Sequence, residues 1–204
     1  MQLTKKTFYI GLAAGSLLAG SAVMAADGAA LYTAKKCNTC HGTDANTPKE
    51  NTTYPKLGGQ KEGYLLAQLK DIRDSKRTNG QSAVMITQPD GMATVSDDEA
   101  AAIAKWIASQ PAAAGGAKTA AVAPYTAKMC QTCHGPDANT PTVSTYPKLG
   151  GQNETYLLTQ LKDIRDGKRA NGQTVVMKAM MDAMKVSDDE AAAIAKWIAS
   201  QPAK

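Results

Sequence analysis

The sequence has very little histidine and few aromatic residues. Only two of its 204 residues are His, and Phe, Trp and Tyr together make up 5% of the chain. Two histidines are too few for a His-rich metal cluster or for a relay of histidines along a proton path. With so few aromatics, domains of about 80 residues would bury thin cores, and small domains usually need a disulfide, a metal or a cofactor to be stable.

Long blocks of one charge are also lacking. The 23 Lys and Arg and the 18 Asp and Glu are spread along the chain, which argues against a nucleic-acid partner. A content of 43% apolar and 20% charged residues argues against disorder. The chain has four Cys, and their arrangement therefore carries most of the information.

The N-terminus reads as a secretory signal. Lys5 and Lys6 precede an apolar run over residues 8–18, and small residues follow up to Ala25. The run is short and contains glycines, so a cleaved signal peptide is favoured over a permanent membrane anchor. Removal of residues 1–25 would leave 21 basic against 18 acidic side chains, a net charge of +3, on a protein exported to the periplasm.

The rest of the chain is an internal repeat at an offset of 91 to 93 residues. The matching segments are 32–37 with 125–130, 54–60 with 146–152, 68–74 with 160–166, and 96–110 with 187–201. Two tandem domains over 26–110 and 124–204 are predicted from this repeat. The Ala/Gly-rich residues 111–123 between them show no core pattern and read as a linker.

Each copy has helical patterning and no competing strand pattern, so the fold class is all-α. A helix over 27–36 is expected to run into the first Cys. Leu65, Leu69 and Ile72 recur at helical spacing, as do their counterparts 157, 161 and 164. A Ser with a Glu three residues later, at 96 and again at 187, predicts the capping box of a C-terminal helix that a Pro ends.

All four Cys and both His lie in two copies of one pentapeptide, Cys37 to His41 and Cys130 to His134. Cys-x-x-Cys-His is the attachment signature of c-type haem: two thiols form thioethers with the porphyrin vinyl groups, and the adjacent His binds the iron. A redox Cys pair, a zinc shared by both pairs and a disulfide framework are the alternatives. None of them requires a His after each pair.

A second axial ligand must come from Met, because no His remains; Met raises the reduction potential. Only two Met pairs persist across the copies, Met85 with Met177 and Met92 with Met184. The first pair follows Asn-Gly-Gln in both copies and is favoured as the ligand pair. The second lies close to its capping Ser and is interpreted as core methionine, although it stays open as the alternative.

Combined with the Tyr-Pro-Lys-Leu-Gly-Gly-Gln, Gln-Leu-Lys-Asp-Ile-Arg and Ser-Asp-Asp-Glu segments of both copies, the haem motifs resemble those of the dihaem cytochrome c4 family. The resemblance covers nearly the whole mature chain. It implies two tandem class I cytochrome c domains, each a small helical fold around one covalent haem, packed about a pseudo-twofold axis. It also implies that the carbonyls of Pro55 and Pro147 accept a hydrogen bond from the proximal His. The gap from Met85 or Met177 to the C-terminal helix is longer than the family's pattern.

Some further residues carry weaker expectations. Two roles are open for Arg73, Arg77, Arg165 and Arg169: they either neutralise haem propionates or form a solvated helix face. The side chains of Tyr54 and Tyr146 either cover a haem edge or belong to the core. Helix packing is expected for Trp106 and Trp197. The predicted haem-binding residues are Cys37, Cys40, His41, Met85, Cys130, Cys133, His134 and Met177. Of these, His41, Met85, His134 and Met177 are the predicted iron ligands.

The leading hypothesis is a periplasmic single-electron carrier with two covalent haems, and not an enzyme. Its partners would be redox proteins: a quinol-oxidising membrane complex or small redox protein as donor, and a terminal oxidase or reductase as acceptor. Neither nucleic acid nor a small-molecule substrate is expected, and the chain is expected to be a monomer of two packed domains, with peripheral membrane association left open. The alternatives are a haem-bearing subunit of a larger oxidoreductase complex and a dihaem dehydrogenase or peroxidase.

Overall fold

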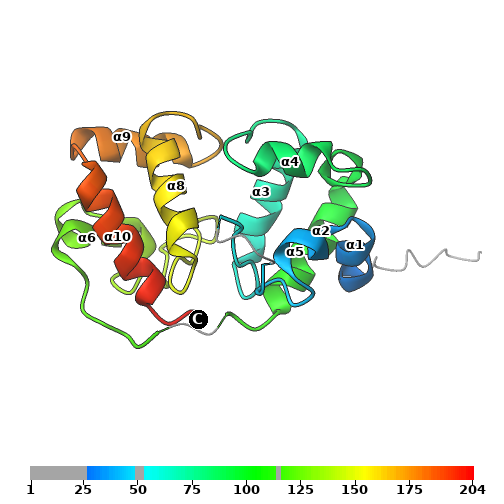
Figure 1. Cartoon of the computed structure of the whole chain (residues 1–204), viewed down its shortest axis with the longest axis horizontal. Coiled ribbons are helices and arrows are strands. Elements are labelled where there is room, and N and C mark those ends of the chain that lie inside the picture. Colours follow the sequence, from blue (N-terminus) through cyan, green and yellow to red (C-terminus); the bar gives the residue numbers. More distant parts are fainter. Residues whose placement is uncertain (1–26, 49–52, 114–115) are drawn as a thin grey trace, which may run out of the picture.

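The computed structural model describes residues 27–48, 53–113 and 116–204, and within them the chain forms helices, turns and loops but no strand. The two halves lie side by side, each with its own set of helices (Figure 1). The expected signal peptide, residues 1–25, lies outside the described residues. No described helix is long and apolar enough to cross a membrane.

The helices of the two halves follow the repeat. The first half contains α1 (Gly28–Ala34), α2 (Cys37–His41), α3 (Glu62–Arg73), α4 (Ser82–Thr87), the short 3₁₀ helix η1 (Met92–Thr94) and α5 (Asp97–Ser109). The second half contains α6 (Ala123–Ala127), α7 (Gln131–His134), α8 (Glu154–Arg165), α9 (Thr174–Ala183) and α10 (Asp188–Ser200). One difference between them is that α9 is longer than α4 and is followed by a turn at residues 184–185, where the first half has the 3₁₀ helix η1.

The core of each half forms around its C-terminal helix. In the first half α5 packs against α1 and α3, and the expected stripe of Leu65, Leu69 and Ile72 is buried against Ile103 and Ile107. In the second half α10 packs against α8 and α6. Both predicted capping boxes are present, at Ser96–Glu99 and at Ser187–Glu190. The apolar periodicity therefore identified the buried faces correctly.

The expected continuous helix into the first Cys was wrong. α1 ends at Ala34, and Lys36 has a left-handed backbone with φ of 61° before α2 begins at Cys37. Met129 repeats this break with φ of 58°. A left-handed residue cannot continue a right-handed helix, so each haem motif starts a new short helix in a new direction.

Aromatic contacts tie the C-terminal helix to the first helix, as expected for the two Trp. The ring of Trp106 lies 4.6 Å from that of Tyr32, and Trp197 lies 4.5 Å from Tyr125. The connector does more than span the gap: Thr119 accepts hydrogen bonds from the indole of Trp197 and from the amide of Gln201. The end of the connector is thus part of the packing of the second half.

Candidate haem sites

The first haem motif lies on α2, where a single helical turn carries Cys37, Cys40 and His41. Gly42 ends the turn with φ of 78°, and a Cβ at this position would collide with the carbonyl oxygen of Thr47. The buried hydroxyl of Tyr32 donates a 2.9 Å hydrogen bond to the Gly42 carbonyl. The second half repeats these contacts, with Tyr125 donating to Gly135 at 2.7 Å. Both motifs are therefore anchored from the first helix of their own half.

His41 is held in one tautomer by a backbone carbonyl. Its Nδ1 lies 3.1 Å from the carbonyl oxygen of Pro55, and because a carbonyl can only accept, Nδ1 must carry the proton. The predicted contact is confirmed for Pro55. Burial lowers the pKa of His41 and the carbonyl acts weakly in the opposite direction, so the ring is neutral at pH 7. Its Nε2 therefore has a free lone pair, which is what an iron ligand requires.

His134 has similar surroundings but differs from His41 in the hydrogen bonding of its Nδ1. Burial lowers its pKa too, and the carbonyl of Pro147 acts on it in the opposite direction, as Pro55 does on His41. Its Nδ1 nevertheless has no partner in hydrogen-bond geometry within the described part of the chain. His134 is half-buried, whereas His41 is 5% exposed. Burial thus lowers the pKa of both proximal histidines, but only His41 has a well-formed hydrogen bond at Nδ1 among the described residues.

The four cysteines are partly buried, and the first Cys of each motif has a raised thiol pKa. None of the four forms a disulfide. Burial raises the pKa of Cys37 to about 11 and that of Cys130 to about 11. A redox-active Cys pair instead depends on a thiolate with a lowered pKa. Among the described residues no group of three or more His, Cys, Asp or Glu is placed to hold a metal ion, which removes the shared zinc site.

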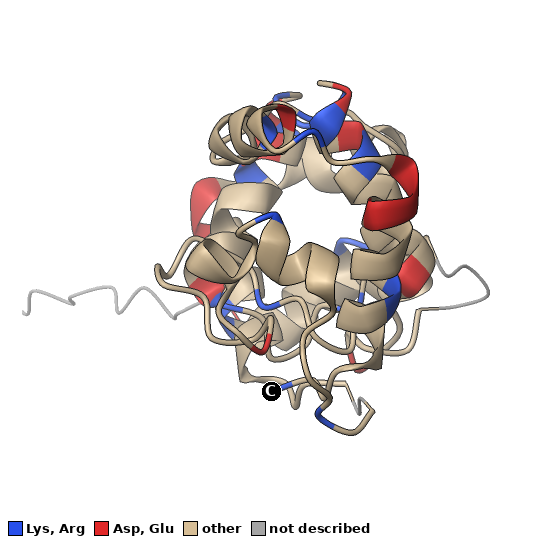
Figure 2. Cartoon of the chain, turned by 90° about the vertical axis from the view of Figure 1, so that its left-hand side faces the viewer, with Lys and Arg blue, Asp and Glu red and all other residues tan. Residues whose placement is uncertain are grey.

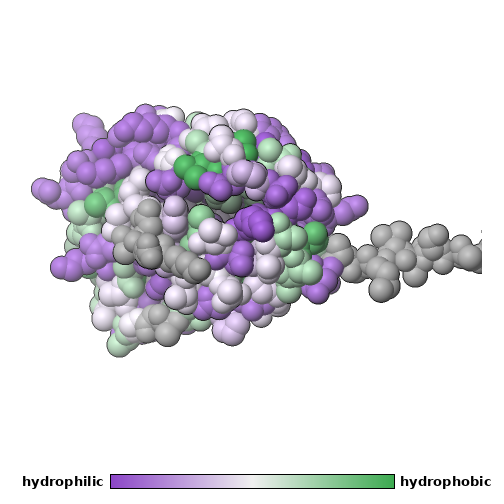
Figure 3. All heavy atoms as spheres, turned by 45° about the vertical axis from the view of Figure 1, so that its right-hand side comes forward, coloured by the Kyte–Doolittle hydropathy of each residue, from purple (hydrophilic) through white to green (hydrophobic). Residues whose placement is uncertain are grey.

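A cavity of about 250 Å³ lies next to the first motif and brings together the predicted haem-binding residues of the first half. Its lining includes Cys37, Cys40, His41, Met85 and Met92. Figure 3 shows a hollow on this side of the molecule with hydrophobic residues beside its opening. The cavity continues across the domain boundary, where residues of the second half, among them Pro147 and Tyr156, also line it. Tyr54 lines it too, with its ring 6.2 Å from that of His41.

The two candidate Met pairs differ in how well the halves match. Met85 and Met177 are each the fourth residue of their helix, α4 and α9, and both are half-buried. Met92 is 4% exposed in the core, but Met184 is half-buried at the end of α9, where its carbonyl accepts from Lys128. Only the first pair therefore keeps equivalent positions in both halves.

Two buried arginines face the domain boundary, and their guanidinium groups donate hydrogen bonds to neutral side chains. The guanidinium of Arg77 donates to Gln68 at 2.8 Å and, across the boundary, to Tyr156 and Gln160 at 3.2 Å each. Arg169 mirrors it, donating to Gln160 at 2.8 Å and to Gln68 at 2.9 Å. Among the described residues neither arginine forms an ion pair. A buried guanidinium keeps its charge and needs an anion, and Arg77 lines the cavity.

The other two candidate arginines lie elsewhere. Arg73 pairs with Asp74 at 2.8 Å and with Asp97 at 2.6 Å. Arg165 repeats this with Asp166 and Asp188. These side chains form ion pairs at the start of the C-terminal helix and contribute little energy at the surface. The expectation of a solvated helix face is therefore right for this pair, and Arg77 and Arg169 are the ones suited to bind propionates.

Known proteins share the sequence over both halves. The family model described as cytochrome c matches residues 25–111 and again 120–202. A cytochrome c4 of Pseudomonas aeruginosa is 38% identical, over 89% of this chain and 92% of its own length. The chain belongs to the cytochrome c4 family. It therefore carries two covalently bound haem c groups, one in each cytochrome c domain.

Two further similarities place the chain among its relatives. A thiosulfate dehydrogenase electron acceptor of Stutzerimonas stutzeri is 35% identical, over 91% of both chains. The crystal structure of reduced recombinant cytochrome c4 from Pseudomonas stutzeri superposes with a TM-score of 0.64, at 28% identity, over 87% of this chain and 98% of that one. The tandem all-α fold predicted from the repeat is confirmed.

The residues of the first cavity fit the cofactor. The thiols of Cys37 and Cys40 match the vinyl groups of a haem c, a neutral imidazole with a free Nε2 and thioether sulfurs match its iron, and a buried guanidinium matches its propionates. The residues missed from the sequence alone are Tyr32, Gln60, Gln68, Gln152 and Tyr156. Each of these residues has an identical counterpart in the other copy, and this recurrence is the sequence signal that could have found them.

Proposed function

We propose that this cytochrome c4 is a periplasmic carrier of single electrons, exported after loss of residues 1–25, with domains over 26–110 and 124–204 joined by the linker 111–123. It takes electrons from a quinol-oxidising complex or a small redox protein and delivers them to a terminal oxidase or reductase. A haem that alternates between ferrous and ferric iron supplies the redox chemistry. The protein binds it, orients it and excludes water.

The observation that carries this proposal is the donor set of the first cavity. His41 offers a free Nε2, and Met85 offers a thioether sulfur in the same cavity. A haem held by both His41 and Met85 would exchange electrons and would leave the iron no site for a substrate. The second domain repeats the set with His134 and Met177, and the four cysteines hold the two porphyrins.

The surface favours brief docking through apolar contact. Lys36, Val84 and Gln88 line the mouth of the first cavity, and the second domain has Met129, Val176 and Met180 at the aligned positions. The three residues of the second domain are all exposed, Val176 at 53% and Met129 at 44%. The charged residues of α9, Lys178 and Asp182, pair with each other at 2.9 Å. We call Met129, Val176 and Met180 the second rim.

The distribution of charge supports the same mode of docking. Basic and acidic residues are interspersed over the helices on the second-domain side (Figure 2). The net charge of +3 expected for the mature chain is offset further by the haem propionates. Transient redox complexes are small interfaces of this kind, so a partner with an apolar surface around its own redox centre fits the second rim.

An optical and ligand-binding experiment tests the carrier against an enzyme. The oxidised holoprotein should show the weak Met-to-iron band at the red end of the spectrum, no high-spin haem and no rapid reaction with cyanide. A substantial high-spin fraction that binds cyanide would favour a dehydrogenase or peroxidase. Gel filtration after extraction without detergent separates the carrier from a subunit of a larger complex, because the carrier should elute alone.

A further inference from the structure

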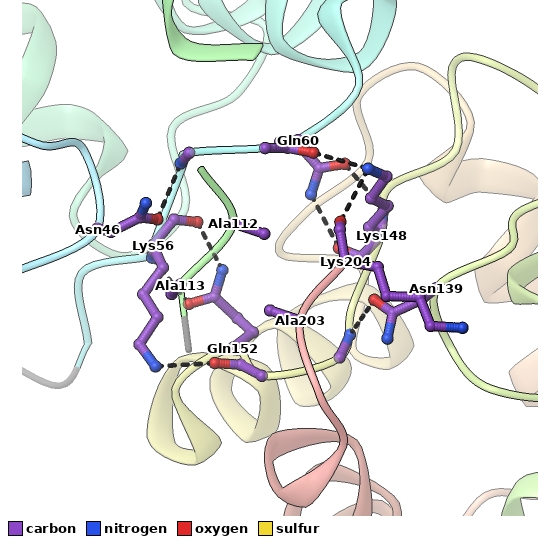
Figure 4. Close-up of a pocket in the computed structure, with 14 residues that line it drawn as sticks. Asn46, Lys56, Gln60, Ala112, Ala113, Asn139, Lys148, Gln152, Ala203 and Lys204 are labelled. Atoms are coloured by element: carbon purple, nitrogen blue, oxygen red, sulfur yellow. Dashed lines mark hydrogen bonds between the residues drawn. The ribbon is translucent and has the colours of Figure 1, made fainter. Parts of the chain in front are cut away.

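The peptide that positions His41 is held by the other domain. The carbonyl of Pro55 accepts from His41, and the N–H of the same peptide unit belongs to Lys56. That N–H donates to Oε1 of Gln152 in the second domain at 2.8 Å, and Nε2 of Gln152 donates back to the Lys56 carbonyl at 2.8 Å (Figure 4). The side chain of Gln152 thus pairs with both backbone polar groups of Lys56, the N–H and the carbonyl.

A second residue of the second domain completes this hold. Nδ2 of Asn153 donates at 2.7 Å to the carbonyl of Tyr54, directly before Pro55. Backbone groups on both sides of Pro55 are therefore fixed from across the boundary. The result is a continuous chain of hydrogen bonds from Gln152, through the Pro55–Lys56 peptide, to Nδ1 of His41.

The second domain has an incomplete copy of this chain. Gln60 pairs with the N–H and the carbonyl of Lys148, each at 2.8 Å, and so holds the peptide that follows Pro147. Lys61, however, aligns with Asn153 and reaches instead to the carbonyls of Pro141 and Val143. Where this second contact differs, Nδ1 of His134 also lacks a well-formed hydrogen bond among the described residues. The two differences occur together.

Hydrogen bonds in a chain polarise one another. A peptide whose N–H donates to Gln152 has a more negative carbonyl oxygen, which is a better acceptor for the His41 proton. A stronger hydrogen bond at Nδ1 makes the imidazole a more basic ligand. A more basic ligand stabilises ferric iron relative to ferrous iron and lowers the reduction potential.

We propose that Gln152 and Asn153 are positioning residues for the haem of the first domain, so that the second domain sets the hydrogen bond of His41 and with it the reduction potential of that haem. This rests on the proposed ligation of the first iron by His41. Electron transfer in the first domain then depends on the docked second domain through a defined hydrogen-bonded path.

The test uses the full-length dihaem protein with Gln152→Met, which keeps the length of the side chain but cannot pair with Lys56. In a redox titration followed by NMR of the haem methyl groups, which resolves the two haems, the potential of the first haem should rise and that of the second should stay. Asn153→Leu should shift the first haem in the same direction by less. Should Gln152→Met fail to fold, Asn153→Leu alone tests the proposal.

Gln60→Met is the matched control because it removes the same pair of interdomain hydrogen bonds on the other side. It should shift the potential of the first haem clearly less than Gln152→Met does, because Gln60 lines the first cavity but pairs with Lys148 and not with the peptide that accepts from His41. An equal upward shift of the first haem in Gln60→Met and Gln152→Met would overturn the proposal, since loosening of the interface would then explain both. Unchanged potentials in Gln152→Met and Asn153→Leu would overturn it as well.

Labelling with ¹⁵N-histidine separates failure of this inference from failure of the haem assignment. With two histidines in the chain, the ring signals are easily assigned. Paramagnetic shifts of the His41 ring in the oxidised protein report ligation, and faster deuterium exchange of its Nδ1–H in Gln152→Met reports a weaker hydrogen bond. An unshifted His41 ring contradicts the proposed ligand. A shifted ring whose exchange does not change contradicts only the role of Gln152.

Discussion

Nδ1 of His41 and the carbonyl oxygen of Pro55 lie 3.1 Å apart, and this contact fixes which nitrogen of the ring is free to bind iron. The acceptor is a backbone atom 14 residues further along the chain, within the repeated motif Tyr-Pro-Lys-Leu-Gly-Gly-Gln. The proximal ligand is therefore prepared by the fold, and the loop that prepares it also forms the domain boundary.

Haem attachment should be required for each domain to pack fully. Replacing Cys37 and Cys40 with Ala, in an export-competent host, should leave the first domain sensitive to protease, because its thin core loses the porphyrin as a packing partner. The second domain should stay largely resistant. Limited proteolysis followed by mass spectrometry measures this, and full resistance of both domains would show that haem is not the stabilising element.

The phenol of Tyr32 should contribute to the stability of the holoprotein. Tyr32→Phe removes the donor to the Gly42 carbonyl, which lies in a buried turn, and should lower the free energy of unfolding by about 1–3 kcal/mol. Tyr125→Phe should cost a similar amount through Gly135. Denaturant unfolding monitored by the haem absorbance measures both, and an unchanged midpoint in either variant would contradict this role.

Acid should weaken the start of the C-terminal helices. The backbone N–H of Ser96 and the ammonium of Lys35 lower the pKa of Glu99 below 4.5, and Glu190 has the same partners in Ser187 and Lys128. A carboxylate with a lowered pKa in the folded state adds stability above the pKa of the unfolded chain and loses it as pH falls through the folded value. Glu99→Gln should therefore flatten the decline in melting temperature below about pH 4.5. An equally steep decline in this variant would contradict the contribution of Glu99.

Exchange with the partner should depend on the apolar character of the second rim. Met129→Lys with Met180→Gln gives the second domain the residues that the first has at these positions, Lys36 and Gln88. The loss of apolar contact should lower the second-order rate of electron transfer to the partner roughly tenfold, the equivalent of about 1.4 kcal/mol. Stopped-flow oxidation by the proposed acceptor, a terminal oxidase, at two ionic strengths measures it. The reverse change in the first domain, Lys36→Met with Gln88→Met, is the control. An equal loss of the electron-transfer rate in both double variants would show that the apolar character of the second rim does not decide docking.

Repetition and periodicity in the sequence were enough to predict the tandem all-α fold, both capping boxes and the buried stripe of Leu65, Leu69 and Ile72. The haem motifs followed from residue spacing alone. The break at Lys36 could not be predicted, because a left-handed backbone at a non-glycine residue leaves no compositional signal. The interdomain bonds of Gln152 could not be predicted either, since they depend on how two separately folded units dock.

Ligation of the two irons by Met85 and Met177 can be tested with four single variants. In oxidised holoprotein, Met85→Ala should abolish the contribution of the first haem to the red-end Met-to-iron band and lower the potential of that haem, while the second haem is nearly unchanged. Met177→Ala should do the same to the second haem. Met92→Ala should cost roughly 2–5 kcal/mol of stability as a buried core change, and both it and Met184→Ala should keep both haems low spin. Loss of the band in Met92→Ala, with Met85→Ala unaffected, would contradict the account.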